Sequence, residues 1–472
     1  FRELFFCAED LMRTLPQITL VSAAVALLAC PSITHAGANR IMDQSASGTA
    51  QSNAFTAQAD DPSAIYYNPA GMTQLRGVQV SLGTLLVGGS SSFRNSAGQT
   101  AKSSFDGSVA YPPPSNFYIT ANLKDLGFTQ LGDLTAGLAV VAPFGTLMRW
   151  PENGPFNTAR TFAALELFDI KPTLAYKLND QLSVGVGADI YTFFNFWGEG
   201  HLQRDFISAG PPAFPLAPAG ARVETTGRDT AAGFNVSLMY TPFRNADGKP
   251  LANIGFVYRS QATLHTKGQF LVDGAVQADT SQTLVLPQIY TGGIALWPVR
   301  DQEHEWKVEM DIDYTGWKSV RNLDLRLSNP AGTNLASPQN WRNTYTVMIG
   351  TEYKWLKPQI LPEWELALRA GYCDSQTPIP DNNFNPEIPD SDNQSVSVGL
   401  GFLCKGHGQF LGLIECGQTG GGILRPKAIA LDTAFQVLLY EPRTVTGNVN
   451  STVNGDYNTT FYVGSVNLRV NF

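Results

Sequence analysis

Apolar and polar residues alternate with a period of two along much of this chain, a pattern typical of β-strands with two different faces. The clearest case is segment 305–314, EWKVEMDIDY, where aromatic and aliphatic side chains share one face and five charged side chains share the other. Five charges on one face predict that this face meets water. Similar segments recur from residue 182 to the C-terminal residue 472. The chain is therefore predicted to be all-β.

The pattern predicts fourteen strands, several of which begin or end at Trp or Tyr. An even strand number, aromatic residues at strand ends, and short turns alternating with long loops are features of bacterial outer-membrane barrels. We therefore predict a 14-stranded antiparallel transmembrane β-barrel over residues 78–472, although alternation alone also fits a secreted β-sandwich. The predicted strands are 78–87, 117–123, 134–148, 165–178, 182–197, 230–242, 254–270, 283–298, 306–327, 341–355, 364–373, 395–403, 429–440 and 459–472.

Residues 12–36 have the organisation of a secretory signal peptide cleaved after Ala36. They combine an arginine, an apolar run and small residues before the predicted cleavage site, and the run is too short for a transmembrane helix. A lipoprotein signal ending at Cys30 is the alternative interpretation. Residues 1–11 precede a methionine, and we interpret them as translated from upstream of the start.

Residues 37–77 lie between the predicted cleavage site and the first predicted strand. They contain Asp-Pro and Asn-Pro steps, which favour turns and short extended pieces over regular strands. A barrel of fourteen strands has an interior too wide to be filled by its own side chains. We therefore predict that this segment folds back into the barrel as a plug. A flexible exported tail is the alternative.

Composition excludes several classes of function. The net charge of −8 argues against a nucleic-acid partner, because such proteins normally carry a basic surface. The histidines belong to no HExxH motif and to no GxSxG turn, so we predict neither an enzyme nor a metal or cofactor site. A general diffusion porin lined by Glu309, Asp311 and Asp313 is a stronger alternative than an enzyme.

Three cysteines follow the predicted signal peptide. Export implies an oxidising compartment, in which cysteines can pair. Cys404 and Cys416 flank a connection that the strand count places on the periplasmic side, so we predict that they form a disulfide. Cys373 lies near the opposite end of a strand and is predicted to be unpaired.

Several segments resemble, in the same order, those of the FadL/TodX (OMPP1) family. They include AFTAQADDPSAIYYNPAGMTQL at 54–75, AVVAPFGTLMRW at 139–150 and DYTGWKSVRNLDL at 313–325. The resemblance implies a monomeric transporter in the bacterial outer membrane that takes up long-chain fatty acids or neutral hydrocarbons. Its expected partners are the hydrophobic ligand and membrane lipids. It also implies an N-terminal hatch that contains the motif Asn68, Pro69 and Ala70.

In this family the ligand leaves sideways through a gap made by an inward kink of the third strand. Pro143 cannot donate to a strand ladder, and Gly145 permits unusual backbone angles. We therefore assign the kink to Pro143, Phe144 and Gly145, the alternative being a bulge with no role in transport.

The expected ligand contacts come from two regions. Phe193, Phe196 and Trp197 end the predicted fifth strand and are expected to line an interior pocket. In the following loop, Phe206 and Phe214 are expected to form an exposed apolar lip, a feature that usually marks a binding surface. The alternative is a proline-stiffened loop packed on its neighbours.

The resemblance also implies basic residues that meet the ligand carboxylate, on the fifth and ninth strands. This sequence departs from that pattern, with Phe193 at the first position and Asp324 at the second. Arg326 falls on the same predicted face as Asp324 and is the expected replacement, the alternative being that it only pairs with Asp324. Fatty acid is therefore the first expectation for the ligand, and a neutral aliphatic or aromatic hydrocarbon is the alternative.

Overall fold

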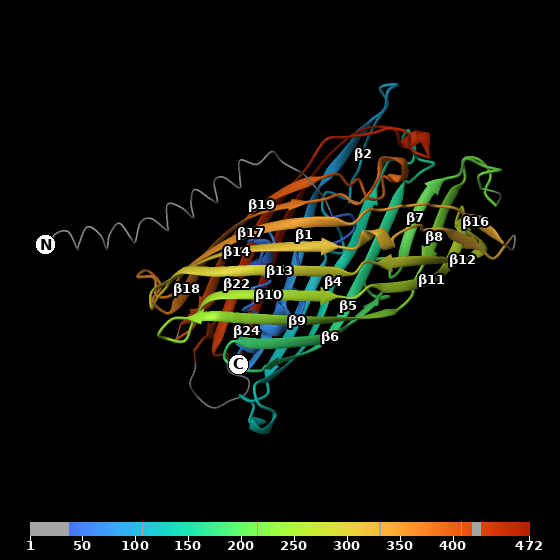
Figure 1. Cartoon of the computed structure of the whole chain (residues 1–472). Coiled ribbons are helices and arrows are strands. Elements are labelled where there is room, and N and C mark those ends of the chain that lie inside the picture. The colour runs from blue at the N-terminus through green and yellow to red at the C-terminus, as the bar shows by residue number, and fades with distance from the viewer. Residues whose placement is uncertain (1–36, 106, 215, 330–331, 407, 418–425) are drawn as a thin grey trace. The chain divides into compact units, whose positions relative to one another are not determined.

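Fourteen antiparallel strands of the described residues close into a barrel, as predicted. Figure 1 shows the barrel with its strands running side by side. The computed structural model describes residues 37–105, 107–214, 216–329, 332–406, 408–417 and 426–472, so the predicted signal peptide lies outside the described residues. Within these ranges, no helix is both long enough and apolar enough to cross a membrane.

Each barrel strand pairs with its neighbours in chain order, and the last strand pairs back with the first from Gln79↔Asn471 to Arg94↔Asp456. The strands therefore close into a complete ring. The barrel strands are β1 (Val78–Arg94), β3 (Ser115–Asn122), β4 (Leu134–Arg149), β5 (Phe162–Lys177), β6 (Leu182–Thr192), β9 (Ala231–Arg244), β10 (Pro250–Arg259), β13 (Ile289–Arg300), β14 (His304–Thr315), β17 (Thr344–Trp355), β18 (Trp364–Ser375), β19 (Asn393–Cys404), β22 (Ala428–Tyr440) and β24 (Gly455–Asn471).

Long connections at one end of the barrel form further strands, and this end is extracellular by the usual loop asymmetry of such barrels. Predicted strands 254–270 and 283–298 were each too long. Each joins part of a barrel strand to part of a separate extracellular hairpin, because the hairpin strands alternate between apolar and polar residues in the same way. Predicted strand 306–327 likewise ended too late. The extracellular elements are β2 (Thr100–Lys102), β7 (Leu202–Ile207), β8 (Arg222–Gly227), β11 (Ala262–Val272), β12 (Ala275–Leu286), β15 (Leu325–Leu327), β16 (Thr333–Leu335), β23 (Arg443–Val445), η3 (Trp317–Ser319), η4 (Asp381–Asn383) and η5 (Ser451–Val453).

The opposite, periplasmic end has shorter connections. It carries η2 (Thr129–Leu131) and a small hairpin of β20 (Gln409–Phe410) and β21 (Ile414–Glu415). Cys404 and Cys416 form a disulfide at the base of this hairpin, with their Cα atoms 5.9 Å apart. Cys373 is a free, buried thiol.

Burial along β14 corrects the expectation that its charged face meets water. Asp311 is fully buried, whereas Ile312 on the opposite face is 45% exposed. The apolar face therefore points outward, as a lipid-facing surface does, and the charged face points into the lumen. This reversal also rules out the secreted sandwich, whose apolar face would be buried.

The lumen is filled by residues 37–77, called here the hatch. It contains the short helices α2 (Ala46–Thr49), α3 (Ala64–Tyr67) and η1 (Pro69–Gln74), and nearly all of its residues are buried. Hydrogen bonds tie it to the wall on several sides. Ala46 N donates to Asn467 of β24 (2.8 Å), and Ser52 N donates to Ser397 of β19 (2.8 Å).

Acidic side chains of β14 hold the middle of the hatch. The backbone N–H groups of Phe55 and Thr56 donate to Asp311, over 3.0 and 2.8 Å, and Ala57 N donates to Glu309 over 2.6 Å. The Arg40 guanidinium lies 2.7 Å from the Asp313 carboxylate. The carboxylates that a diffusion porin would present to its channel are therefore bonded to the hatch.

Candidate functional site

The wall of the barrel is interrupted beside β4. The β4–β5 register shifts between Val141 and Phe144, because one extra β4 residue is accommodated there. On the other edge, pairing between β3 and β4 ends at Phe117↔Val140. The upper half of β4 therefore lacks β3 as a neighbour, and the predicted residues Pro143, Phe144 and Gly145 lie at the start of this unpaired edge.

The hatch occupies the edge that β3 leaves free. Ile41 N donates to Pro143 O, and Gly145 N donates to Asn39 O, both over 2.9 Å. The Gln44 side chain accepts from Ala142 N (3.2 Å) and donates to Ala142 O (3.1 Å). Backbone polar groups that a closed ladder would satisfy are thus satisfied by the hatch. Opening this part of the wall requires the hatch residues 39–44 to move.

A cavity of about 210 Å³ lies at this interruption and is called here the window cavity. Its lining runs from the lumen, at Tyr440 and the hatch, to outward-facing side chains of the barrel, at Phe168 and Trp197. The lining is mostly apolar. It comprises Ala38, Asn39, Arg40, Ile41, Asp43, Leu85, Val87, Phe105, Ala110, Pro112, Pro114, Ala142, Phe144, Gly145, Thr146, Leu147, Met148, Leu165, Glu166, Leu167, Phe168, Trp197, Ile388, Pro389, Asp390, Leu438, Tyr440, Phe461 and Val463.

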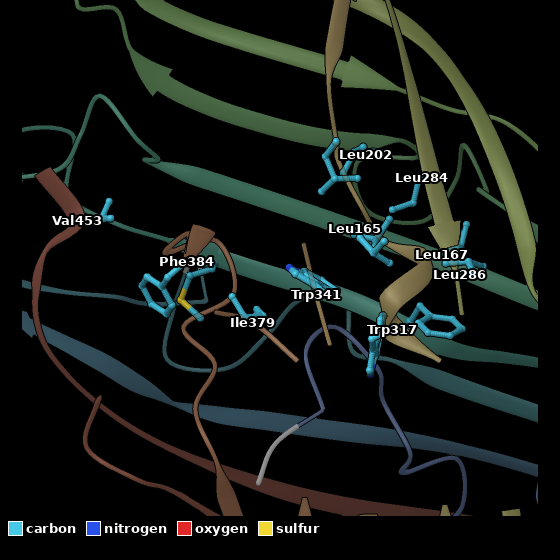
Figure 2. Close-up of a cluster of buried hydrophobic side chains, with 14 of the residues drawn as sticks. Leu165, Leu167, Leu202, Leu284, Leu286, Trp317, Trp341, Ile379, Phe384 and Val453 are labelled. Atoms are coloured by element: carbon cyan, nitrogen blue, oxygen red, sulfur yellow. The ribbon is translucent and has the colours of Figure 1, made fainter. Parts of the chain in front are cut away.

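A narrow apolar passage of about 20 Å³, called here the neck, adjoins the window cavity. Trp317 and Trp341 form one side, with ring centroids 5.2 Å apart. Figure 2 shows these two indoles in the same cluster as Leu165, Leu202 and Leu284. The neck and the window cavity share Asn39, Thr146, Leu165 and Ile388.

A third cavity, of about 260 Å³, lies among the extracellular loops and is called here the mouth cavity. It shares Arg204, Leu323 and Glu387 with the neck. The three cavities therefore adjoin one another in order from the extracellular side to the interruption in the wall.

Two guanidinium groups surround one carboxylate at the junction of mouth and neck. Arg160 Nη2 and Arg204 Nε lie 2.8 and 2.9 Å from the same Glu387 oxygen, Oε2. Burial lowers the pKa of Arg160 to about 10, although Glu387 opposes that effect. Burial by itself would raise the pKa of Glu387, but Arg204 and Arg160 hold it below its ordinary value. The group carries a net positive charge, and no atom of the described residues accepts from the buried Arg160 Nε.

The predicted lip residues lie in the mouth cavity but are not an exposed lip. Phe206 is only 7% exposed, because it packs with Phe214 and the β8 and β11 side chains Val223 and Phe270. The Phe206 and Phe214 ring centroids are 4.6 Å apart. These two rings form one apolar wall of the cavity.

The predicted interior aromatic pocket is only partly found. Phe193 packs against the interior cluster, but β6 ends at Thr192 and the chain then turns over the outer surface. Phe196 is 81% exposed there, and Trp197 contacts the outer end of the window cavity. Phe196 and Trp197 therefore lie outside the lumen.

Arg326 is not inside the barrel. It lies on the extracellular strand β15 with its side chain exposed, and it lines none of the three cavities. Asp324 is in the same loop, where its carboxylate accepts from Ser337 N over 2.9 Å. Sequence reasoning missed Arg160, Arg204 and Glu387. They come from three separate loops, and no local pattern links them.

The predicted hatch motif docks the hatch against β6 and β9. Asn68 is fully buried, caps η1 by accepting from Ala70 N (3.1 Å), and donates to Thr56 O (2.8 Å) and Leu238 O (3.2 Å). Ala70 N also donates to Ser237 Oγ of β9 over 2.9 Å. A Cβ on Gly185 of β6 would lie 2.6 Å from Ala70 N, so only glycine permits this approach.

These features define an outer-membrane β-barrel transport protein with an internal hatch rather than an open pore. Residues 27–409 match the family described as outer membrane protein transport protein (OMPP1/FadL/TodX), and the chain belongs to that family. Members of this family are transporters of the Gram-negative outer membrane and not enzymes. In the described part of the chain, no group of three or more His, Cys, Asp or Glu residues is placed to hold a metal ion.

Three comparisons show the range of the similarity. The long-chain fatty acid transport protein of Salmonella typhi is 22% identical over 290 residues, which are 56% of this chain and 61% of that protein. A crystal structure of a Pseudomonas aeruginosa FadL homologue is 17% identical and covers 92% of this chain and all of its own, with a TM-score of 0.69. The toluene transporter TodX of P. putida is 17% identical and has a TM-score of 0.56, and the similarity covers 90% of this chain and 98% of TodX.

Proposed function

We propose that this protein takes up long-chain fatty acids through the mouth cavity and the neck and releases them sideways through the window cavity. The observation that carries the proposal is the series of three adjoining cavities with shared lining residues. The series ends at the interruption between β3 and β4 and not at the periplasmic side of the hatch.

A sideways exit suits an apolar cargo. Each methylene group transferred from water to an apolar environment is favourable by ~0.8 kcal/mol, so a long acyl chain that entered the aqueous periplasm would lose many such contributions. Leaving through the wall keeps the chain in contact with apolar surface throughout. The neck is too narrow for a chain at rest, so we expect the Trp317 and Trp341 side chains to move during passage.

The arginines at the junction of mouth and neck favour a fatty acid over a hydrocarbon as the ligand. Arg160 and Arg204 are donors of the kind that bind carboxylates, and Arg160 Nε faces no protein acceptor. We propose that they take the role expected of Arg326. The Salmonella typhi relative is named as a long-chain fatty acid transport protein, whereas TodX is named as a toluene transporter. Uptake of a neutral hydrocarbon is therefore the second candidate, favoured by the apolar neck.

Binding of oleate and of a matched neutral ligand, methyl oleate, tests the proposal in wild type and Arg160→Met. Arg204 still pairs with Glu387 in this variant, so no carboxylate is left alone. We expect roughly tenfold weaker binding of oleate and little change for the ester, since a charge-assisted hydrogen bond is worth ~1.5–3 kcal/mol. Arg326→Met is the matched control and should bind oleate as wild type does. If both ligands bind alike and Arg160→Met changes neither, the cavities form a hydrocarbon site.

A further inference from the structure

Charge changes sign along the route from mouth to window. Two guanidinium groups and one carboxylate meet at the mouth. Among the described residues that line the window cavity, three are carboxylic acids: Asp43, Glu166 and Asp390. The single basic residue in that lining is Arg40, whose guanidinium is bonded to Asp313. An anion that leaves a positive site therefore arrives at one whose ionisable groups, apart from the paired Arg40, are all acids.

Within the part of the chain that the structure describes, no cation is bonded to the Asp390 carboxylate. Its Oδ2 accepts from Thr377 Oγ1 (2.7 Å) and from Ala38 N (3.1 Å), and the residue is 3% exposed. Arg443 bonds the carbonyl oxygen of Asp390 (2.6 Å) and the Asp381 carboxylate, and not the Asp390 side chain. Burial raises the pKa of Asp390 to about 7, although the hydrogen bonds from Thr377 and Ala38 and the charge of Arg443 oppose this effect, and the Asp392 carboxylate adds slightly to it.

The other two acids are also without a basic partner in the window cavity. Asp43 lies in the hatch, accepts from Asn53 Nδ2 over 2.9 Å, and has Tyr67, Tyr440 and Cys373 as its titratable neighbours. Glu166 is at the outer end, where it accepts from Glu199 N over 2.7 Å and faces the Glu199 side chain. The window cavity is thus apolar and acidic from its lumenal end to its outer end.

We propose that the window cavity admits fatty acids in the protonated, neutral form. The inference rests on the fatty acid transport proposed above. A carboxylate placed in an apolar site among three acidic side chains has no compensating charge, which is costly. Each acid that binds at the mouth as RCOO⁻ therefore takes up one proton from the aqueous phase and leaves as RCOOH. No bond to carbon changes, and the neutral acid is also the form that enters a bilayer most readily.

Oleate labelled with ¹³C at its carboxyl carbon tests the proposal, because the chemical shift of that carbon reports ionisation directly. The purified barrel is titrated with labelled oleate between pH 5 and pH 9 as wild type, Asp43→Asn/Asp390→Asn and Asp456→Asn. Asn is isosteric with Asp and keeps an acceptor for Ala38 N. Asp456 is a control carboxylate that lines none of the three cavities.

We expect two bound signals at pH 7.5, one ionised and one protonated. The ionised signal should weaken in Arg160→Met. The protonated signal should titrate about one pH unit lower in the double variant than in wild type, because the negative charge that Asp43 and Asp390 carry when ionised is gone, and should not move in Asp456→Asn. In liposomes, oleate release should slow as the pH rises, and release of methyl oleate should not.

Three results would overturn the inference or its basis in different ways. If all bound oleate is ionised at pH 7.5 and still taken up, the proton requirement is wrong but fatty acid transport stands. If a protonated signal exists but the double variant leaves its midpoint unchanged, Asp43 and Asp390 do not create it. If oleate fails to bind at any pH while methyl oleate binds, fatty acid transport itself is wrong.

Discussion

Single polar residues decide how the hatch is held in the lumen. Asn68 is the clearest case, because its side chain accepts one hydrogen bond as a helix cap and donates two to carbonyl groups of the hatch and the wall. The Pro that follows fixes the start of η1 and needs no N–H partner at that position. The Asn-Pro-Ala motif is therefore a docking device rather than a ligand contact.

Asn68→Ala should loosen the hatch without unfolding the barrel. The change removes a cap and leaves two buried carbonyl groups with fewer donors, at a cost of ~1–3 kcal/mol. In planar bilayers we expect larger and noisier ion conductance than in wild type. Asn458→Ala, at an exposed position of β24, is the control. Conductance equal to that of wild type would mean that the hatch does not depend on this motif.

Asp390 predicts a pH-dependent stability. Its pKa is about 7 in the folded protein and near 4 in an unfolded chain, so the folded state binds the proton more tightly. Stability should therefore fall as the pH rises from about 4 to about 7, by up to a few kcal/mol, and level off above that. Thermal unfolding of Asp390→Asn should show a smaller loss between pH 5 and pH 8. If Asp390→Asn loses as much stability as wild type over this pH range, Asp390 is not the group responsible for the loss.

At the scale of elements, the two-residue alternation identified the barrel strands because a membrane barrel exposes an apolar outer face on every strand. It misplaced strand ends at the extracellular side, since hairpin β11–β12 has two different faces as well. It also assigned the charged face of β14 to water, because alternation alone does not tell a water-filled lumen from one filled by a hatch. An irregularity in β4 was predictable from Pro143, which has no N–H for a ladder, and the β4–β5 register does shift there.

The bonds between β14 and the hatch predict a second route to a leaky barrel. Asp311→Ala removes the acceptor of Phe55 N and Thr56 N and should raise conductance in bilayers, as Asn68→Ala does. Asp311→Asn keeps one oxygen acceptor and should have a smaller effect. If both variants conduct as wild type does, the β14 carboxylates are not what retains the hatch.

At the scale of the whole molecule, the proposed ligand route depends on contacts that no local pattern records. Arg160, Arg204 and Glu387 meet only because loops after β4, β6 and β18 converge above the barrel. The proposed exit likewise combines the upper edge of β4 with residues of the hatch, which lies far earlier in the chain. Sequence reasoning selected the Pro143 segment and the hatch separately, but their mutual hydrogen bonds required the fold.

Filling the window cavity tests sideways release most directly. A Cβ on Gly145 would lie 3.0 Å from Ile41 Cδ1 in this cavity, so Gly145→Leu should obstruct it. Oleate binding to the purified variant should persist, while oleate uptake by cells should drop roughly tenfold if the added side chain raises the barrier to passage by about 1.4 kcal/mol. Leu138→Phe, on the lipid-facing side of the same strand, should take up oleate normally. Normal uptake by a correctly folded Gly145→Leu barrel would contradict release through the wall.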